Sequence, residues 1–221
     1  MIRYLARAAC LVLVTAPLYA TTYTLEPDYT QGVLRWNHLG FSSPAAQFAQ
    51  GQGTLEFDPA NPTHASVKVT IPLSTLNTGV PALDDDFRSS DFFDTARFPT
   101  ATFTSTRVEP AGTDRLAHGS SDRAASEGIP GGDGLKVTGD LNLHGVTRPV
   151  TLDVTLVKIG TNPRSGVPTI GFDATTTLKR SEFGLGEYVP QVGDEIQMHI
   201  ITQGAEAKAY AEYLRAHPPK K

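Results

Sequence analysis

The sequence contains a single cysteine, Cys10, which lies in an N-terminal apolar segment. Its surroundings do not suit lipid attachment, because Arg7 stands where an apolar residue is needed and the apolar run follows the cysteine. If cleavage removes this segment, the remaining chain has no thiol. Disulfides, thiolate metal sites and thiol nucleophiles are then excluded. We therefore expect stability to come from a sheet and its core.

The sequence also lacks an apolar run of the roughly 20 residues that a membrane-spanning helix needs. The first 20 residues instead have the features of a cleaved signal peptide. Arg3 and Arg7 precede a short apolar run from Ala8 to Leu18, and the small residue Ala20 lies at the expected cleavage position. This pattern predicts an exported, periplasmic protein, and the domain that follows the signal peptide is expected to span 21–204.

Excess positive charge is absent as well. The chain has 19 lysines and arginines against 23 acidic residues, a net charge of −4, and it has no basic run longer than the pairs Lys179-Arg180 and Lys220-Lys221. This balance argues against nucleic acid as a partner.

Convergent reactive groups are missing from the sequence. Its six histidines are dispersed without ligand spacing, and no glycine-rich phosphate loop precedes a helix. The acidic run Asp84-Asp85-Asp86 does not point at one centre, because consecutive positions diverge. We expect no catalytic residues, no metal site and no cofactor.

Period-2 alternation of apolar and polar residues is abundant and is typical of antiparallel strands with one buried face. The candidate strands are 33–39, 48–57, 67–71, 101–108, 135–143, 150–156, 169–178 and 195–202. Eight strands suit closure into a small barrel, which removes exposed edges. The sequence predicts an all-β fold with a single antiparallel eight-stranded barrel.

Three regions lack this alternation. Residues 73–99 carry four phenylalanines and predict short helices and an ordered loop capping one barrel opening. Residues 111–134 are rich in Gly, Ser and Asp, which is typical of a flexible surface loop. The stretch 205–216 has helical spacing, so the tail 205–221 is expected to be partly helical, either docked or frayed.

Alternation also indicates which side chains point inward. His38 shares a face with Leu34 and Trp36, where a ligand contact and a hydrogen-bonded core histidine are both open; the second is favoured. Ala174 is a small residue among larger inward neighbours, where an interior space would be widest. His144 is expected in a hairpin turn with a local role. Composition alone does not distinguish a filled barrel from a hollow one.

Five motifs resemble those of the YceI-like family of exported lipid-binding proteins, in the family's order and over nearly all of the chain after residue 20. They are Trp36-Asn37-His38-Leu39-Gly40-Phe41-Ser42, Gly53-Thr54-Leu55-Glu56-Phe57-Asp58, the stretch from Arg88 to Phe103, the stretch from Gly139 to Val150, and Arg180-Ser181-Glu182-Phe183-Gly184.

The resemblance implies a lipocalin-like barrel whose elongated cavity holds an isoprenoid or a similar amphiphilic lipid. It places Phe92 and Phe93 at the cavity mouth, and Trp36 and His38 in its wall. Together with these four, the expected ligand-binding residues are Phe87, Phe103, Phe172, Ala174 and Met198. A transient membrane contact and a homodimer stay open as further interactions.

The sequence departs from the family before Arg88. The family has an arginine-aspartate pair and then a histidine-leucine pair, where this chain has Leu83, Asp84, Asp86 and Phe87. The missing basic groups favour a neutral head, such as a quinone or an amide, over a diphosphate. Two other classes of function stay open: an envelope enzyme or redox accessory acting on a quinone-like isoprenoid, and a filled barrel that serves as an interaction module.

Overall fold

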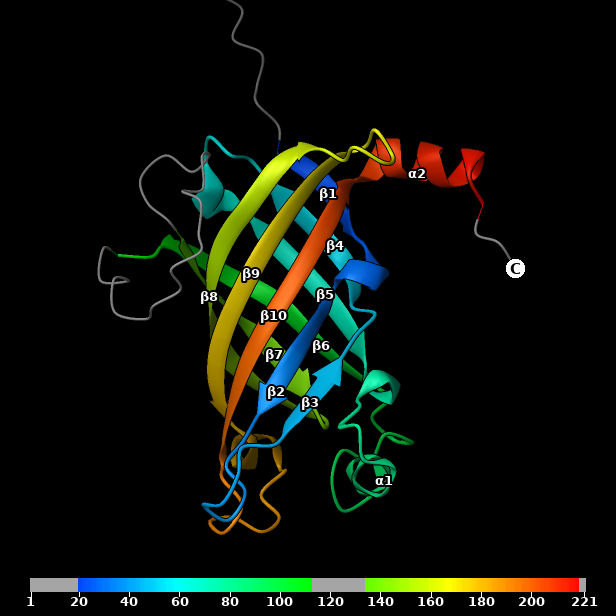
Figure 1. Cartoon of the computed structure of the whole chain (residues 1–221). Helices are drawn as coiled ribbons and strands as arrows, with labels where there is room; N and C mark the ends of the chain where they lie inside the picture. The colour runs from blue at the N-terminus through cyan, green and yellow to red at the C-terminus, as the bar shows by residue number, and fades with distance from the viewer. Residues whose placement is uncertain (1–19, 113–133, 219–221) are drawn as a thin grey trace, which may run out of the picture.

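The computed structural model describes residues 20–112 and 134–218, which form a closed antiparallel β-barrel (Figure 1). The strands follow the order β1-β4-β5-β6-β7-β8-β9-β10-β2-β3, and pairing of β1 with β10 closes the wall. The strands are β1 (Thr21–Leu25), β2 (Gln31–Arg35), β3 (Ala45–Phe48), β4 (Gln52–Phe57), β5 (Ser66–Pro72), β6 (Thr100–Pro110), β7 (Leu135–Leu143), β8 (Val146–Thr161), β9 (Pro168–Lys179) and β10 (Glu195–Glu206). The helices are α1 (Pro81–Arg88), α2 (Ala207–Ala216) and the short 3-10 helices η1 (Pro27–Tyr29), η2 (Pro62–His64), η3 (Leu73–Thr75) and η5 (Arg180–Phe183).

Two positions in the wall are each filled by a pair of strand segments. β1 and β2 pair with successive parts of β10, with Leu25 opposite Gly204 and Gln31 opposite Ile201. β3 and β4 are likewise separated by only three residues, and they pair with β2 and β1 respectively. The wall therefore has eight strand positions, which confirms the predicted eight-stranded antiparallel barrel.

The strand boundaries differ from the sequence prediction in several places. β1 was not predicted, the strand expected over 33–39 ends at Arg35, and the one expected over 48–57 is interrupted at 49–51. β8 extends well beyond the predicted 150–156. The signal-peptide prediction falls almost wholly on residues 1–19, and the loop prediction over 111–134 mostly on 113–133; both lie outside the described residues.

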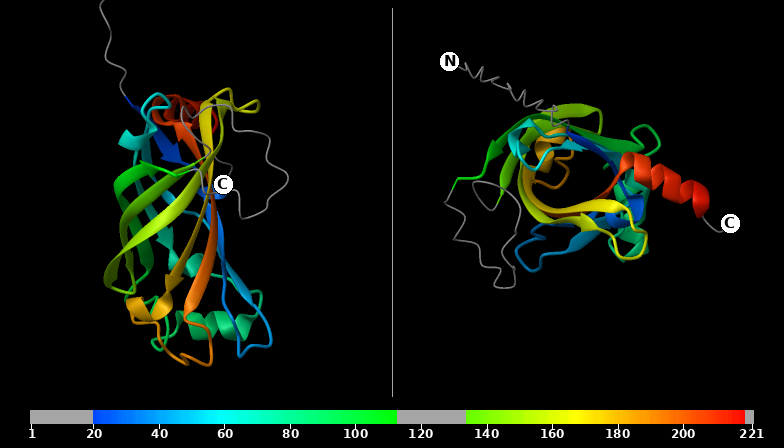
Figure 2. Two further views of the ribbon diagram at one scale, coloured as in Figure 1. Left: turned by 90° about the vertical axis from the view of Figure 1, so that its left-hand side faces the viewer. Right: turned by 90° about the horizontal axis from the view of Figure 1, so that it is seen from above.

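The barrel's two ends differ in their coverings. Figures 1 and 2 show α1 at one end, which we call the cap end, and α2 at the opposite end. The predicted cap over 73–99 contains η3 and α1, and the predicted C-terminal helix is α2, which contacts β1 and β10. No helix in the described part of the chain has the length and apolar character needed to span a bilayer.

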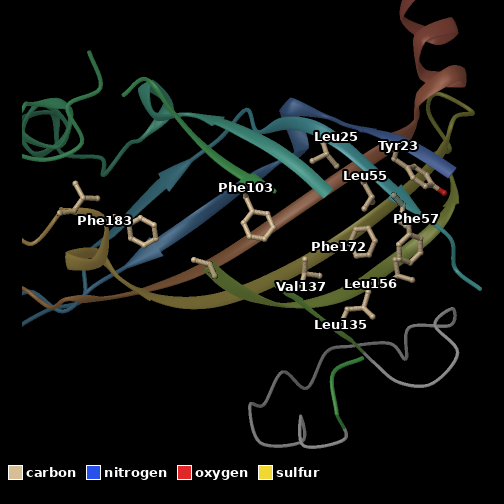
Figure 3. Packing of buried hydrophobic residues seen from close by; sticks show 13 residues of the cluster. Tyr23, Leu25, Leu55, Phe57, Phe103, Leu135, Val137, Leu156, Phe172 and Phe183 are labelled. Carbon is tan, nitrogen blue, oxygen red and sulfur yellow. The ribbon is translucent and has the colours of Figure 1, made fainter. Parts of the chain in front are cut away.

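Many of the buried core residues lie toward the α2 end. Figure 3 shows Tyr23, Phe57, Leu156 and Phe172 gathered there, whereas Phe183 lies apart, nearer the cap end. The rings of Phe57 and Phe172 meet edge to face with centroids 5.5 Å apart. Apolar burial of this kind is the main stabilising term for such a fold.

Candidate functional site: the barrel interior at the cap end

The inward side chains at the cap end leave apolar surface uncovered. Met198 of β10 lies opposite Thr176 of β9 on one side and Leu34 of β2 on the other. All three are only partly buried, as is Leu178 of β9. Ile170, farther along β9 toward the α2 end, is 0% exposed. The same wall is therefore filled near α2 and incompletely filled near the cap.

A cluster of aromatic rings lies where the cap meets the barrel. The ring centroid of Phe87 in α1 is 5.6 Å from that of Trp36, 5.6 Å from that of Phe92 and 5.9 Å from that of Phe93. All four side chains are partly buried. Three of these rings and Met198 pack against one apolar cluster with Phe48 and Leu76. The cap thus adds aromatic surface to the partly filled end of the barrel.

Asp84 fixes the chain just before α1. Its buried carboxylate accepts hydrogen bonds from the backbone N–H and the hydroxyl of Thr78, both at 2.7 Å. These two bonds lower the pKa of Asp84 from its ordinary value. Asp85 instead pairs with Arg88 at the surface, so the acidic run diverges. Among residues 20–112 and 134–218, no three His, Asp or Glu side chains are grouped to hold a metal ion.

The structure divides the predicted ligand-binding residues into two groups. Trp36, Phe87, Phe92, Phe93 and Met198 come together at the cap end with part of their surface exposed. In the packed half of the barrel, the exposed fractions of the other three are small: Phe103 6%, Phe172 8% and Ala174 7%. Ligand contact stays a prediction for both groups, and the first group has the surface available for it.

His38 does not continue the inward face of β2. The strand ends at Arg35, and His38 is an exposed residue whose backbone pairs with Ser42 and Val192. The alternation that placed it beside Leu34 stops before reaching it, so the predicted inward position is wrong.

His144 does occupy the predicted hairpin turn, where it and Gly145 have φ angles of 52° and 74°. Its role is not local, however. Its Nδ1 atom lies 3.2 Å from the carbonyl oxygen of Phe183, and its ring packs edge to face on Phe98 at 4.9 Å. The turn therefore ties together three segments at the cap end, which corrects the sequence prediction.

Arg180 was not predicted to have a role, although the matched family motif begins with it. The side chain is buried, and its guanidinium donates hydrogen bonds to the carbonyl oxygens of Gly193, Val192 and Leu185. Burial lowers its pKa, although Asp194 and Glu187 oppose this. Arg180 thus fixes the loop 184–194 beside the barrel's cap end.

A polar pocket of about 540 Å³ lies beside Trp36. Its lining includes two cationic side chains, Arg35 and Lys179, and two carboxylates, Asp194 and Glu195. Glu195 and Gln197 alternate along β10 with the inward-facing Met198, so this pocket opens on the outer face of the barrel wall, where its charges are balanced.

Comparison with known proteins agrees with the family that the motifs resemble. Residues 23–203 match the model of the YceI-like domain. Protein YceI of Escherichia coli O157:H7 is 34% identical over 174 residues, 79% of this chain and 80% of that protein. Protein YceI of Salmonella heidelberg (strain SL476) is 31% identical over 202 residues, 90% of this chain and 95% of that protein.

Solved structures share the barrel. The crystal structure of Burkholderia cenocepacia BcnA matches with a TM-score of 0.63 at 25% identity, covering 79% of this chain and 95% of that one. A polyisoprenoid binding domain from Saccharophagus degradans, implicated in plant cell wall breakdown, matches with a TM-score of 0.60 at 15% identity, covering 84% of this chain and 99% of that one. The second likeness concerns the fold alone. From its sequence motifs, its matched domain and its relatives, this chain belongs to the YceI-like family.

Proposed function

We propose that this protein is a periplasmic carrier that holds an isoprenoid or a similar long-chain amphiphile in the cap half of its barrel and catalyses no reaction. The observation that supports this proposal is the uncovered apolar surface inside a closed wall, seen at Leu34, Met198 and Leu178. A packed structural core covers such surface with other side chains. An elongated apolar ligand would cover it here.

Burial of the chain supplies most of the affinity in this proposal. At about 0.8 kcal/mol for each buried CH₂ group, one five-carbon isoprene unit contributes roughly 3–4 kcal/mol as an upper bound. A few units therefore offset the cost of association. The length of the apolar tail matters more than the chemistry of the head.

The head group of the ligand is neutral in this proposal. The family's arginine and histidine positions before Arg88 are occupied here by Leu83 and Asp86, which favours a neutral head over an anionic one. The ligand class agrees with the name of the Saccharophagus neighbour, which is described as a polyisoprenoid binding domain.

The test is the lipid content of protein purified from the periplasm, measured by solvent extraction and mass spectrometry. Met198→Trp places an indole at a partly exposed inward position and should displace most of the lipid while the barrel stays folded. Ile201→Trp is the matched control, because Ile201 lies on the outward face of the same strand and is 37% exposed. The control should retain its lipid. Lipid-free wild-type protein, or equal loss in both variants, would contradict the proposal.

A further inference from the structure

Three large apolar side chains project into solvent from two neighbouring loops at the cap end. The exposed fractions are 91% for Phe41, 50% for Leu39 and 61% for Tyr188. They lie on the loop 36–44 between β2 and β3 and the loop 184–194 between η5 and β10, which Figure 1 shows at the same end as α1. We call these three side chains the apolar tips. Proteins rarely expose several large apolar side chains on neighbouring loops, and such a group marks an interaction surface.

The two loops hold the tips in fixed positions. The backbone N–H of Leu39 donates to the carbonyl of Gln191 at 3.2 Å, and that of Gly193 donates to the carbonyl of Asn37 at 2.8 Å. The Oδ1 atom of Asn37 also accepts a bond from the N–H of Gly40 at 2.8 Å. These bonds therefore hold the two loops, and with them the apolar tips, in one fixed arrangement. Arg180 fixes the loop 184–194 further through its bonds to that loop's carbonyl oxygens.

Two of the tips carry backbone strain as well. Leu39 has a φ of 57° and Tyr188 a φ of 62°, a region that side chains of this size rarely adopt. Strain of this kind is retained mainly where it serves binding or catalysis. An exposed apolar side chain on a strained backbone combines two unfavourable features at one residue, and this occurs in both loops.

The apolar tips are connected to the interior of the cap end. The ring of Tyr188 lies 6.2 Å from that of Phe92, which in turn neighbours Phe87, and Phe87 neighbours Trp36. A continuous series of aromatic rings thus leads from the exposed tip to the partly filled barrel. A surface that covers the apolar tips would therefore also contact the series of aromatic rings that leads to the apolar interior.

The shape and charge of this surface fit a bilayer better than a protein partner. Three side chains of this size offer on the order of a few hundred Å², well below the roughly 800 Å² per partner of a stable protein interface. Projecting aromatic and leucine side chains suit the membrane–water interface. The neighbouring charges are mixed, Arg35 and Lys179 against Glu187 and Asp194, so no basic patch is present here to favour anionic lipid.

We propose that the apolar tips insert into the interface of an electrically neutral bilayer, so that the cap end of the barrel faces the membrane. This inference rests on the proposed function, because it identifies the surface from which the lipid chain enters and leaves the barrel. Phe41 is the principal anchor, and Leu39 and Tyr188 set the orientation.

The test is co-flotation with phosphatidylcholine vesicles in 0.5 M salt, a condition of roughly 4–5 Å Debye length that screens surface charges. Phe41→Ser should lower the partition coefficient about tenfold, and Phe41→Ser with Tyr188→Ser should lower it further. Leu214→Ser is the matched control, since Leu214 is 41% exposed on α2 at the other end, and it should bind like wild type. Phe41→Trp should gain fluorescence that brominated phosphatidylcholine quenches, above the background of Trp36.

Lipid extraction separates this inference from the proposed function. Phe41→Ser protein should retain the lipid found in wild type while its vesicle partitioning falls, because the tips lie outside the barrel. Lipid-free wild-type protein would overturn the carrier proposal without affecting the flotation result. Equal flotation of all variants, or an apolar-tip-dependent dimer in light scattering with no vesicle binding, would overturn the membrane inference.

Discussion

At the scale of single residues, buried polar groups position the cap end. Arg180 satisfies three carbonyl oxygens of the chain between η5 and β10, and His144 lies at the carbonyl of Phe183. Buried carbonyls that lose their donors cost free energy, so such side chains are structural constraints as much as contacts. The site's surface is apolar, but its placement depends on polar residues.

Arg180→Lys should therefore destabilise the protein. A lysine ammonium is a compact charge that does not reproduce the planar guanidinium's three bonds. We expect a loss of about 2–4 kcal/mol in the free energy of unfolding, measured by urea denaturation. Arg35→Lys, at an exposed position, should change it little. Equal, small effects of both substitutions would show that the loop is held by other contacts.

Asp84 gives the cap a dependence on pH. Its folded-state pKa is lowered by the bonds from Thr78, so its contribution is present above the ordinary value of 3.8 and is lost as the pH falls through the folded value. Asp84→Ala should lower the free energy of unfolding at pH 7, and the difference from wild type should shrink below about pH 4. The exposed Asp85→Ala is the control. A difference that grows on acidification would contradict this assignment.

At the scale of elements, regular alternation predicted most strands, because long two-faced segments such as β7, β9 and β10 carry the pattern through their full length. β1 has the same pattern over Tyr23 and Leu25, but it is only five residues long and adjoins the predicted signal peptide. β1 and β2 are separate strands because they pair with different parts of β10, and β3 and β4 because they pair with β2 and β1 respectively. A single sequence does not show which segments pair. The apolar tips and Arg180 were missed for the same reason.

Ala174 shows how packing limits a prediction from residue size. The sequence suggested an interior space beside it, yet the structure buries it between Val154 and Ile200, with 7% of its surface exposed. Ala174→Trp should thus overpack this layer and cost about 1–3 kcal/mol in urea denaturation. Met198→Trp, two steps toward the cap, should cost less. The reverse order would place the unfilled space near the packed half.

At the scale of the whole molecule, the barrel has a filled half and a half lined by uncovered apolar surface. The filled half provides the stability that allows the other to lack a complete core. In the proposed function, the half near α2 serves stability and the half near the cap serves ligand binding. Buried core residues, open apolar surface and exposed apolar tips therefore follow one another from α2 to the cap end.

Export is the prediction that concerns the whole chain. N-terminal sequencing of protein from the periplasm should find Thr21 as the first residue, because Arg3 and Arg7 precede a short apolar run that ends before Ala20. Replacing Leu11 and Leu13 by arginines should leave full-length protein in the cytoplasm. Full-length protein retained in the inner membrane of wild-type cells would show instead that the segment is an anchor.

The closure of the wall has a consequence for the time course of folding. Tyr23 of β1 pairs with Glu206 of β10, so the barrel cannot close before its last strand is present. No N-terminal fragment can close the barrel on its own. A chain whose decisive contacts join its two ends has a high contact order, and such β-rich domains fold in milliseconds to seconds. That delay keeps the barrel incomplete until its final strand is made, and a chain that has not closed its barrel is easier to thread through a narrow translocation channel than a finished one.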